Sequence, residues 1–194
     1  MRIAVFVVAL CGLAREASAH TVIEGLGGFH GGLLHPVLVP AHALGLLALG
    51  LLIGQQPRPA RLLLLAAFAG ALVFATLLIT RAYAPADAET ALLASGAAAG
   101  LLAAVGRPVP LLVGGIPVLA GGVALQLDSV PALPSVRDTL TSLAGTALGA
   151  ILVLVLVAGN TMEPKRAWLR VGVRATGSWI AAAMALVLAL KHLR

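Results

Sequence analysis

The sequence predicts an all-α membrane protein, in which a cleavable signal peptide is followed by a bundle of six transmembrane helices. Composition is the first reason: of 194 residues, 60% are hydrophobic and only 10% are charged, whereas a soluble domain carries about a quarter charged residues. The mean hydropathy of +1.06 agrees with this. The second reason is that the apolar residues form runs long enough to cross ~30 Å of hydrocarbon, separated by short breaks that contain charges or prolines.

The first 19 residues are predicted to be a secretory signal peptide. Arg2 provides the charged start, residues 3–14 the short apolar core, and the small residues 17–19 the cleavage site. An uncleaved anchor helix is the alternative, although twelve apolar residues are too few to span the hydrocarbon. Cleavage would make His20 the mature N-terminus and leave residues 20–194 as the membrane domain. It would also remove the only cysteine, which excludes disulfides and thiolate metal sites.

Six apolar runs follow, and each is expected to be a helix because backbone groups that face lipid must be satisfied within their own segment. We place these spans near residues 33–54, 62–80, 90–105, 109–127, 139–158 and 171–190. The third run is short, and the sequence "GRPVP" at 106–110 predicts a tight hairpin between the third and fourth runs.

Small residues are dense inside these runs. The sequences "GAAAG" at 96–100 and "GTALG" at 145–149 have the small-xxx-small spacing that lets helices approach closely. The glycine pairs at 114–115 and 121–122 are expected to serve the same purpose, and Pro117 is expected to kink the fourth span. We interpret all of these as packing features without chemistry of their own.

The charged residues predict how the spans are oriented, because Lys and Arg favour cytoplasmic loops. With the signal peptide removed, the N-terminus faces the periplasm and the protein lies in the bacterial inner membrane. The loops then predicted to be cytoplasmic hold seven basic residues, namely Arg58, Arg61, Arg107, Lys165, Arg166, Arg170 and Arg174. The outer loops and the tail hold four, namely Arg81, Arg137, Lys191 and Arg194. The acids are distributed the other way, with Glu24, Asp87, Glu89, Asp128 and Asp138 outside and Glu163 inside. The formal charge of +6 is therefore explained by the basic residues that orient the spans, and no nucleic-acid partner is expected.

Four of the five histidines lie between residues 20 and 42, in the sequence "HTVIEGLGGFHGGLLHPVLVPAH". His35 and His42 share one side of a straight helix but lie about 10 Å apart along its axis. Two imidazoles at that separation cannot bind one ion unless Pro40 kinks the helix sharply. They could instead bind an ion one after the other along a transport path, or contact different partners. An ionisable residue within a span is a functional hypothesis by default. The alternative is a neutral histidine bonded to a neighbouring carbonyl or to Ser or Thr.

The N-terminal histidine predicts a different kind of site. A free His20 would offer its amine and its ring Nδ1 as a chelating pair, and imidazole suits nickel, copper and zinc. Glu24 and His30 lie in the same glycine-rich segment and could add ligands. The alternative is a solvated tail that binds nothing.

This stretch resembles the start of the HupE/UreJ family, through His20-Thr21 and the segment "GGFHGGLLHP". That family consists of small membrane proteins associated with nickel hydrogenases and ureases, regarded as nickel permeases or accessory proteins. A signal peptide, a mature N-terminal His and six spans also match, so the resemblance covers the whole chain. It implies a protein embedded in the lipid bilayer that handles nickel as a transported ion rather than a tightly bound cofactor. It also implies nickel-enzyme maturation proteins as partners.

The family's first signature, HPxxGxDH, reads "HPVLVPAH" in this chain. His35, Pro36 and His42 match, whereas Val39 stands in place of the glycine and Ala41 in place of the aspartate.

The second signature, FHGxAHGxE, is best placed on "ASGAAAGLL" at 94–102. The two glycines and Ala98 match, but the aromatic, the two histidines and the glutamate are replaced by Ala94, Ser95, Ala99 and Leu102. A dication in hydrocarbon needs ligands and countercharge, and every acid of the mature chain falls in a predicted loop or tail. The resemblance therefore implies a nickel permease, while the local chemistry predicts a weak one.

Three functions remain open at this point. The first is a metal permease in which the N-terminal ligands capture the ion and the two span histidines pass it inward. The second is a divergent accessory or structural membrane protein that has lost its permeation ligands and acts through a partner. The third is a redox module with haem held between a span histidine and His192, the one histidine left, near the end of its span. No nucleophile–base pair or pair of intramembrane carboxylates indicates an enzyme.

Overall fold

The computed structural model describes residues 28–81, 83, 87–133, 135–161 and 167–193. The predicted signal peptide and two candidate ligands, His20 and Glu24, lie outside these residues. The described part of the chain is helical between its connecting segments. Its helices are α2 (Gly28–Leu38), α3 (Pro40–Gly54), α4 (Arg58–Thr80), α5 (Ala88–Val105), α6 (Leu111–Asp128), α7 (Val136–Thr161) and α8 (Ala167–His192).

Five of these helices, α4 to α8, are long and apolar enough to cross a membrane, and α2 with α3 forms a sixth, bent candidate. The six predicted runs therefore correspond to helices whose ends differ from the predicted ones by a few residues. The predicted tight connection occupies residues 106–110, and Gly106 ends α5 with a φ of +71°. Glycine suits this left-handed conformation because it has no Cβ.

The first span is not the single helix expected over 33–54. Helices α2 and α3 meet at a bend of 69°, and Val39 between them is extended, with a φ of −87° and a ψ of 114°. Pro40 explains the break, because it has no N–H to donate and because its ring disfavours the helical conformation in the residue before it. Pro40 itself begins α3, a position where the missing N–H would have no partner within the helix.

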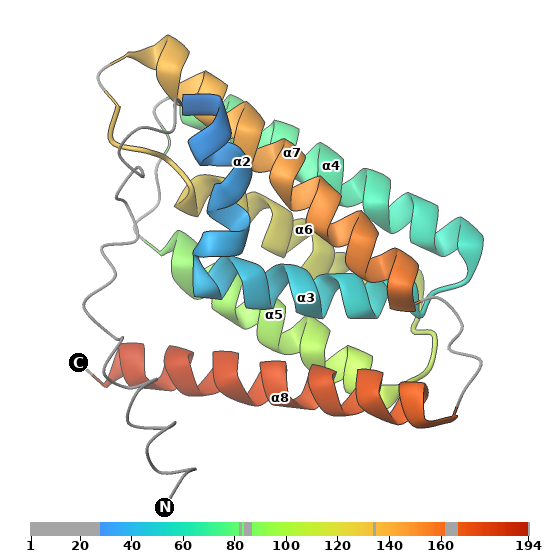
Figure 1. Cartoon of the computed structure of the whole chain (residues 1–194). Coiled ribbons are helices and arrows are strands. Elements are labelled where there is room, and N and C mark those ends of the chain that lie inside the picture. The colour runs from blue at the N-terminus through green and yellow to red at the C-terminus, as the bar shows by residue number, and fades with distance from the viewer. Residues whose placement is uncertain (1–27, 82, 84–86, 134, 162–166, 194) are drawn as a thin grey trace, which may run out of the picture.

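Helix α7 lies beside both halves of the broken span (Figure 1). Gly32 of α2 lies against the carbonyl of Ser142, and Gly54 of α3 lies against Ala158 and Thr161. Helix α3 also packs against α5, which in turn packs against α6 and α8, while α4 packs against α6. Ten of the fifteen residues of α3 are buried. A polar side chain on α3 is therefore surrounded by protein rather than by lipid.

The two ends of the bundle carry different charges. We call one the acidic end, defined by Glu89, Asp128 and Asp138, and the other the basic end, defined by Arg61, Arg107, Arg170 and Arg174. At the acidic end, Lys191 of α8 pairs with Glu89 of α5 at 2.6 Å. At the basic end, the Gln55 amide donates a hydrogen bond of 3.1 Å to the carbonyl of Ala103. The predicted orientation assigns the acidic end to the periplasm and the basic end to the cytoplasm.

The two small-xxx-small motifs are confirmed as packing sites. A Cβ on Gly145 or Gly149 would overlap backbone carbonyls of α2, and a Cβ on Gly96 or Gly100 would overlap atoms of α8. These glycines let the backbones of neighbouring helices approach closely, as the spacing predicts.

Large apolar side chains lie on the surface of the bundle as well as in its interior. Phe68, Leu49 and Leu125 are fully buried, yet Leu112 and Trp179 are 83% and 77% exposed. Large apolar side chains with this exposure on several helices are typical of a surface that faces lipid. The chain is therefore a multi-pass membrane protein.

Candidate functional site

The bend in the first span brings His35 and His42 together. His35 lies in the last turn of α2 and His42 in the first turn of α3. Their ring centroids are 5.0 Å apart, with an angle of 75° between the ring planes. The separation of about 10 Å that a straight helix would give is therefore wrong. The span has instead the sharp bend at Pro40 that would allow the two rings to meet. The two imidazoles therefore lie side by side rather than at separate levels of the span.

His42 has a partner that the sequence did not suggest. It is fully buried, and its Nε2 lies 2.8 Å from Oδ2 of Asp128, whose side chain is 23% exposed. For His42 the partner is therefore a carboxylate and not the carbonyl, Ser or Thr of the alternative interpretation. Asp128 is the last residue of α6, where the negative end of the helix dipole disfavours a carboxylate. The hydrogen bond from the imidazole compensates for that unfavourable position.

The hydrogen bond also determines which nitrogen of His42 can bind a metal. An ionised carboxylate only accepts hydrogen bonds, so the tautomer that suits an ionised Asp128 is the one with its proton on Nε2. In the neutral ring, Nδ1 then holds a lone pair. This atom is buried and has no hydrogen-bond partner within the described residues. Metal-binding histidines commonly donate their second ring N–H to a carboxylate in this way.

Gln126 fixes the end of α6 that carries Asp128. Its side chain is fully buried, and its amide nitrogen lies 3.0 Å from Oγ1 of Thr76 in α4 and 3.1 Å from the carbonyl of Leu143 in α7. These two contacts tie the last turn of α6 to two neighbouring helices. Gln126 therefore helps to hold Asp128 in place, and no local sequence pattern indicates this because its partners are distant in the chain.

The other two histidines of the described residues do not join the pair. His30 of α2 is exposed and contacts the ring of Phe29 at a centroid distance of 5.8 Å. His192 is exposed at the far end of α8. Across the described residues, no group of three or more His, Cys, Asp or Glu is placed to hold a metal ion. Any metal site here therefore consists of few protein ligands.

Three of the four positions at which this chain departs from the second signature lie inside the bundle, whereas Ala94 is exposed. Ser95 and Ala99 of α5 are buried, and Ser95 donates a hydrogen bond of 2.9 Å to the carbonyl of Leu92. Leu102 is half-buried and packs against the core. Where polar residues would face the interior, this chain therefore has small or apolar side chains.

Together these features define a class of protein: a multi-pass helical membrane protein with two adjacent imidazoles, of which the buried one is bonded to a carboxylate. A family model described as HupE / UreJ protein matches residues 8–188. The chain belongs to the HupE/UreJ family. No curated protein and no solved structure was found to match it.

Proposed function

We propose that this HupE/UreJ protein is a permease or accessory protein for a transition-metal ion, nickel first, and that the ion binds at His35 and His42. The observation that carries the proposal is the buried His42, whose Nε2 is bonded to a carboxylate while its Nδ1 has no partner in the described chain. Imidazole nitrogen is a ligand that suits nickel. The edge-to-face contact of the two rings puts a second imidazole beside the first.

Asp128 supplies the countercharge that appeared to be missing. A desolvated dication needs negative charge nearby as well as ligands, and Ala41 stands where the family signature has an aspartate. The carboxylate of Asp128 reaches His42 from another helix and serves the same purpose. Two imidazoles, with Asp128 acting only through its hydrogen bond to His42, bind an ion less completely than a closed four-ligand site, which suits transport because a permeation site must also release its ion.

The route follows from the predicted orientation. The signal peptide of residues 1–19 is removed, and the amine and ring of His20, with Glu24 and His30, capture the ion in the periplasm. The ion then enters at the acidic end, where the partly exposed Asp128 connects the surface to the histidine pair. Nickel-enzyme maturation proteins receive it on the cytoplasmic side of the inner membrane.

A second candidate function is that of an accessory protein that does not transport. The apolar packing at Ala99 and Leu102 favours it, because a dication moving past this part of α5 would meet no ligand from either position. In that case the histidine pair would stabilise the bend and would not bind cargo.

Uptake of radioactive nickel by cells that lack their own importers separates the two functions. We expect saturable uptake by the wild-type protein, with a loss of tenfold or more in His42→Ala and in Asp128→Asn, which keeps an acceptor but removes the charge. Asp138→Asn is the matched control, since Asp138 is an exposed acid at the same end. Membrane levels of each variant are compared by immunoblot. Wild-type protein that is correctly inserted and transports nothing would favour the accessory function, and undiminished uptake by Asp128→Asn would exclude the proposed site.

A further inference from the structure

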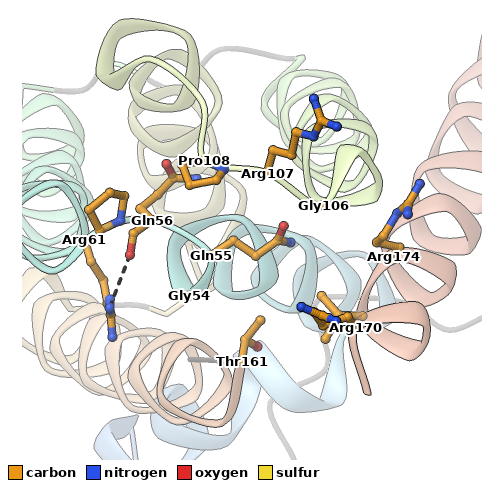
Figure 2. A pocket seen from close by; sticks show the side chains of 12 residues that line it. Gly54, Gln55, Gln56, Arg61, Gly106, Arg107, Pro108, Thr161, Arg170 and Arg174 are labelled. Atoms are coloured by element: carbon orange, nitrogen blue, oxygen red, sulfur yellow. Dashed lines mark hydrogen bonds between the residues drawn. The ribbon is translucent and has the colours of Figure 1, made fainter. Parts of the chain in front are cut away.

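A cavity of about 350 Å³ lies at the basic end of the bundle. It is formed where the end of α3, the start of α4, the 106–108 turn, the end of α7 and the first turns of α8 meet (Figure 2). Its volume falls within the range of about 300–1,000 Å³ that is typical of small-molecule sites. The cavity is distant in the fold from the histidine pair, which lies at the acidic end.

The charged residues that line this cavity are all basic. Four of its residues are arginines, Arg61, Arg107, Arg170 and Arg174, and none of its described residues is acidic. Guanidinium groups keep their charge at all physiological pH values. The two ion pairs found among the described residues involve His42 and Lys191, so neither neutralises one of these arginines. Four like charges around one cavity repel one another and favour a bound anion.

Two of the arginines are held in place by backbone contacts. A terminal nitrogen of Arg61 donates to the carbonyl of Gln56 at 3.2 Å, and Nε of Arg174 donates to the carbonyl of Ala104 at 3.0 Å. Nε of Arg61 is buried and has no hydrogen-bond partner within the described chain. A guanidinium has five N–H donors, so each of these residues keeps most of its donors for a ligand.

The turn beside the cavity is shaped to admit one of these side chains. Gly106 has a positive φ, and a Cβ at this position would lie 2.6 Å from Cδ of Arg174. A larger residue would therefore displace that arginine. A general preference for basic residues on the cytoplasmic side explains why the loops are positive. It does not explain why arginines from α4, the 106–108 turn and α8 surround one cavity, with two of them tied to carbonyls.

We propose that this cavity, which we call the basic pocket, binds a phosphate group. The planar guanidinium group of arginine forms paired hydrogen bonds with phosphate oxygens. Four guanidinium groups supply more N–H donors than the two oxygens of a carboxylate can accept, so a phosphate group fits this pocket better than a carboxylate does. The cavity lies at the end of the bundle, and the ends of transmembrane helices are where headgroups are met. Basic pockets between transmembrane helices on the cytoplasmic side bind anionic headgroups, and free phosphate compounds are the other source of the same group. The inference does not depend on the proposed metal transport.

The test uses the full-length protein in nanodiscs. In the lipid arm, discs of phosphatidylcholine with a fifth of phosphatidylglycerol or cardiolipin are compared with discs of phosphatidylcholine alone, and thermal stabilisation and retained anionic lipid are measured. In the soluble arm, inorganic phosphate and ATP are titrated into the protein in phosphatidylcholine discs. Stabilisation in the lipid arm alone identifies a headgroup site, and binding in the soluble arm identifies a site for a free phosphate compound. Both results support the proposal.

The variants distinguish a pocket from general charge attraction. Arg107→Gln/Arg170→Gln changes two exposed arginines that make no tertiary hydrogen bond within the described residues, and we expect it to weaken binding by tenfold or more. Arg81→Gln/Arg137→Gln removes the same charge at the opposite end and should change binding less than twofold. Arg107→Lys/Arg170→Lys keeps the charge but removes the paired guanidinium donors, so this variant should also bind the phosphate group more weakly. It tests the proposal even if the glutamine variant fails to fold. Absence of binding in both arms, or equal losses in the pocket and control variants, would overturn the proposal.

Discussion

Replacing Asp128 with Ala is expected to destabilise the bundle, because it leaves the Nε2–H of His42 without an acceptor. His42 is 0% exposed in the wild type, so water can replace the lost partner only through the space that the shortened side chain leaves. A buried donor left unsatisfied costs about 1–3 kcal/mol. Hydrogen bonds between transmembrane helices average ~0.6 kcal/mol in double-mutant cycles, and a bond to an ionised group is stronger. We therefore expect a coupling free energy of about 1–2 kcal/mol between His42 and Asp128.

The assay is a double-mutant cycle on the free energy of unfolding, measured by adding denaturing detergent to the folded protein in mild detergent. The cycle compares the wild type with Asp128→Ala, His42→Ala and the double variant, which should lose less than the sum of the single losses. Asp138→Ala serves as a control and should change stability by less than about 1 kcal/mol. If the single effects add within ~0.5 kcal/mol, the pair makes no net contribution and the assignment of the proton to Nε2 loses its support.

Three further predictions concern packing, the bend and topology. Gly145→Ala should lower the free energy of unfolding by about 1–3 kcal/mol, since the added Cβ would overlap a carbonyl of α2. Gly159→Ala is the control, because a Cβ there meets open space. Unfolding of both variants in denaturing detergent measures the difference. Pro40→Ala should straighten the first span, separate the two imidazoles and weaken nickel binding measured by titration, and unchanged affinity would contradict the need for the bend. N-terminal sequencing of the purified protein should begin at His20, and a reporter fused near Lys165 should be active only in the cytoplasm.

The helices were predictable because each span is a continuous local run of apolar residues. Residues 62–80 need no knowledge of the rest of the chain to be recognised, since the bilayer requires a helix of that length. The same holds for the motif at 145–149, whose spacing alone indicates a close helix contact. The degree of bending was not predictable. A proline within a membrane span is compatible with anything from a mild kink to a break, and neighbouring helices decide the outcome.

The functional site was only half predictable, because its parts come from distant positions. The sequence drew attention to His35 and His42 as ionisable residues in a span, but Asp128 was assigned to a loop and lies 86 positions from His42. Similarly, Arg107 and Arg174 were counted as indicators of topology, and only their arrangement around one cavity suggests a ligand. Contacts between residues this far apart in the chain depend on how the helices pack, and no local sequence pattern predicts that packing.

The break in the first span also has a consequence for the order of assembly. Helix α2 has 11 residues and α3 has 15, and at 1.5 Å per residue neither reaches across ~30 Å of hydrocarbon alone. The packing partner of α2 is α7, with Gly32 seated on the carbonyl of Ser142, a residue made 110 positions later. The earliest span to leave the ribosome thus stays incomplete until nearly the whole protein has been synthesised, and a chain truncated before α7 should fail to hold its first span in place.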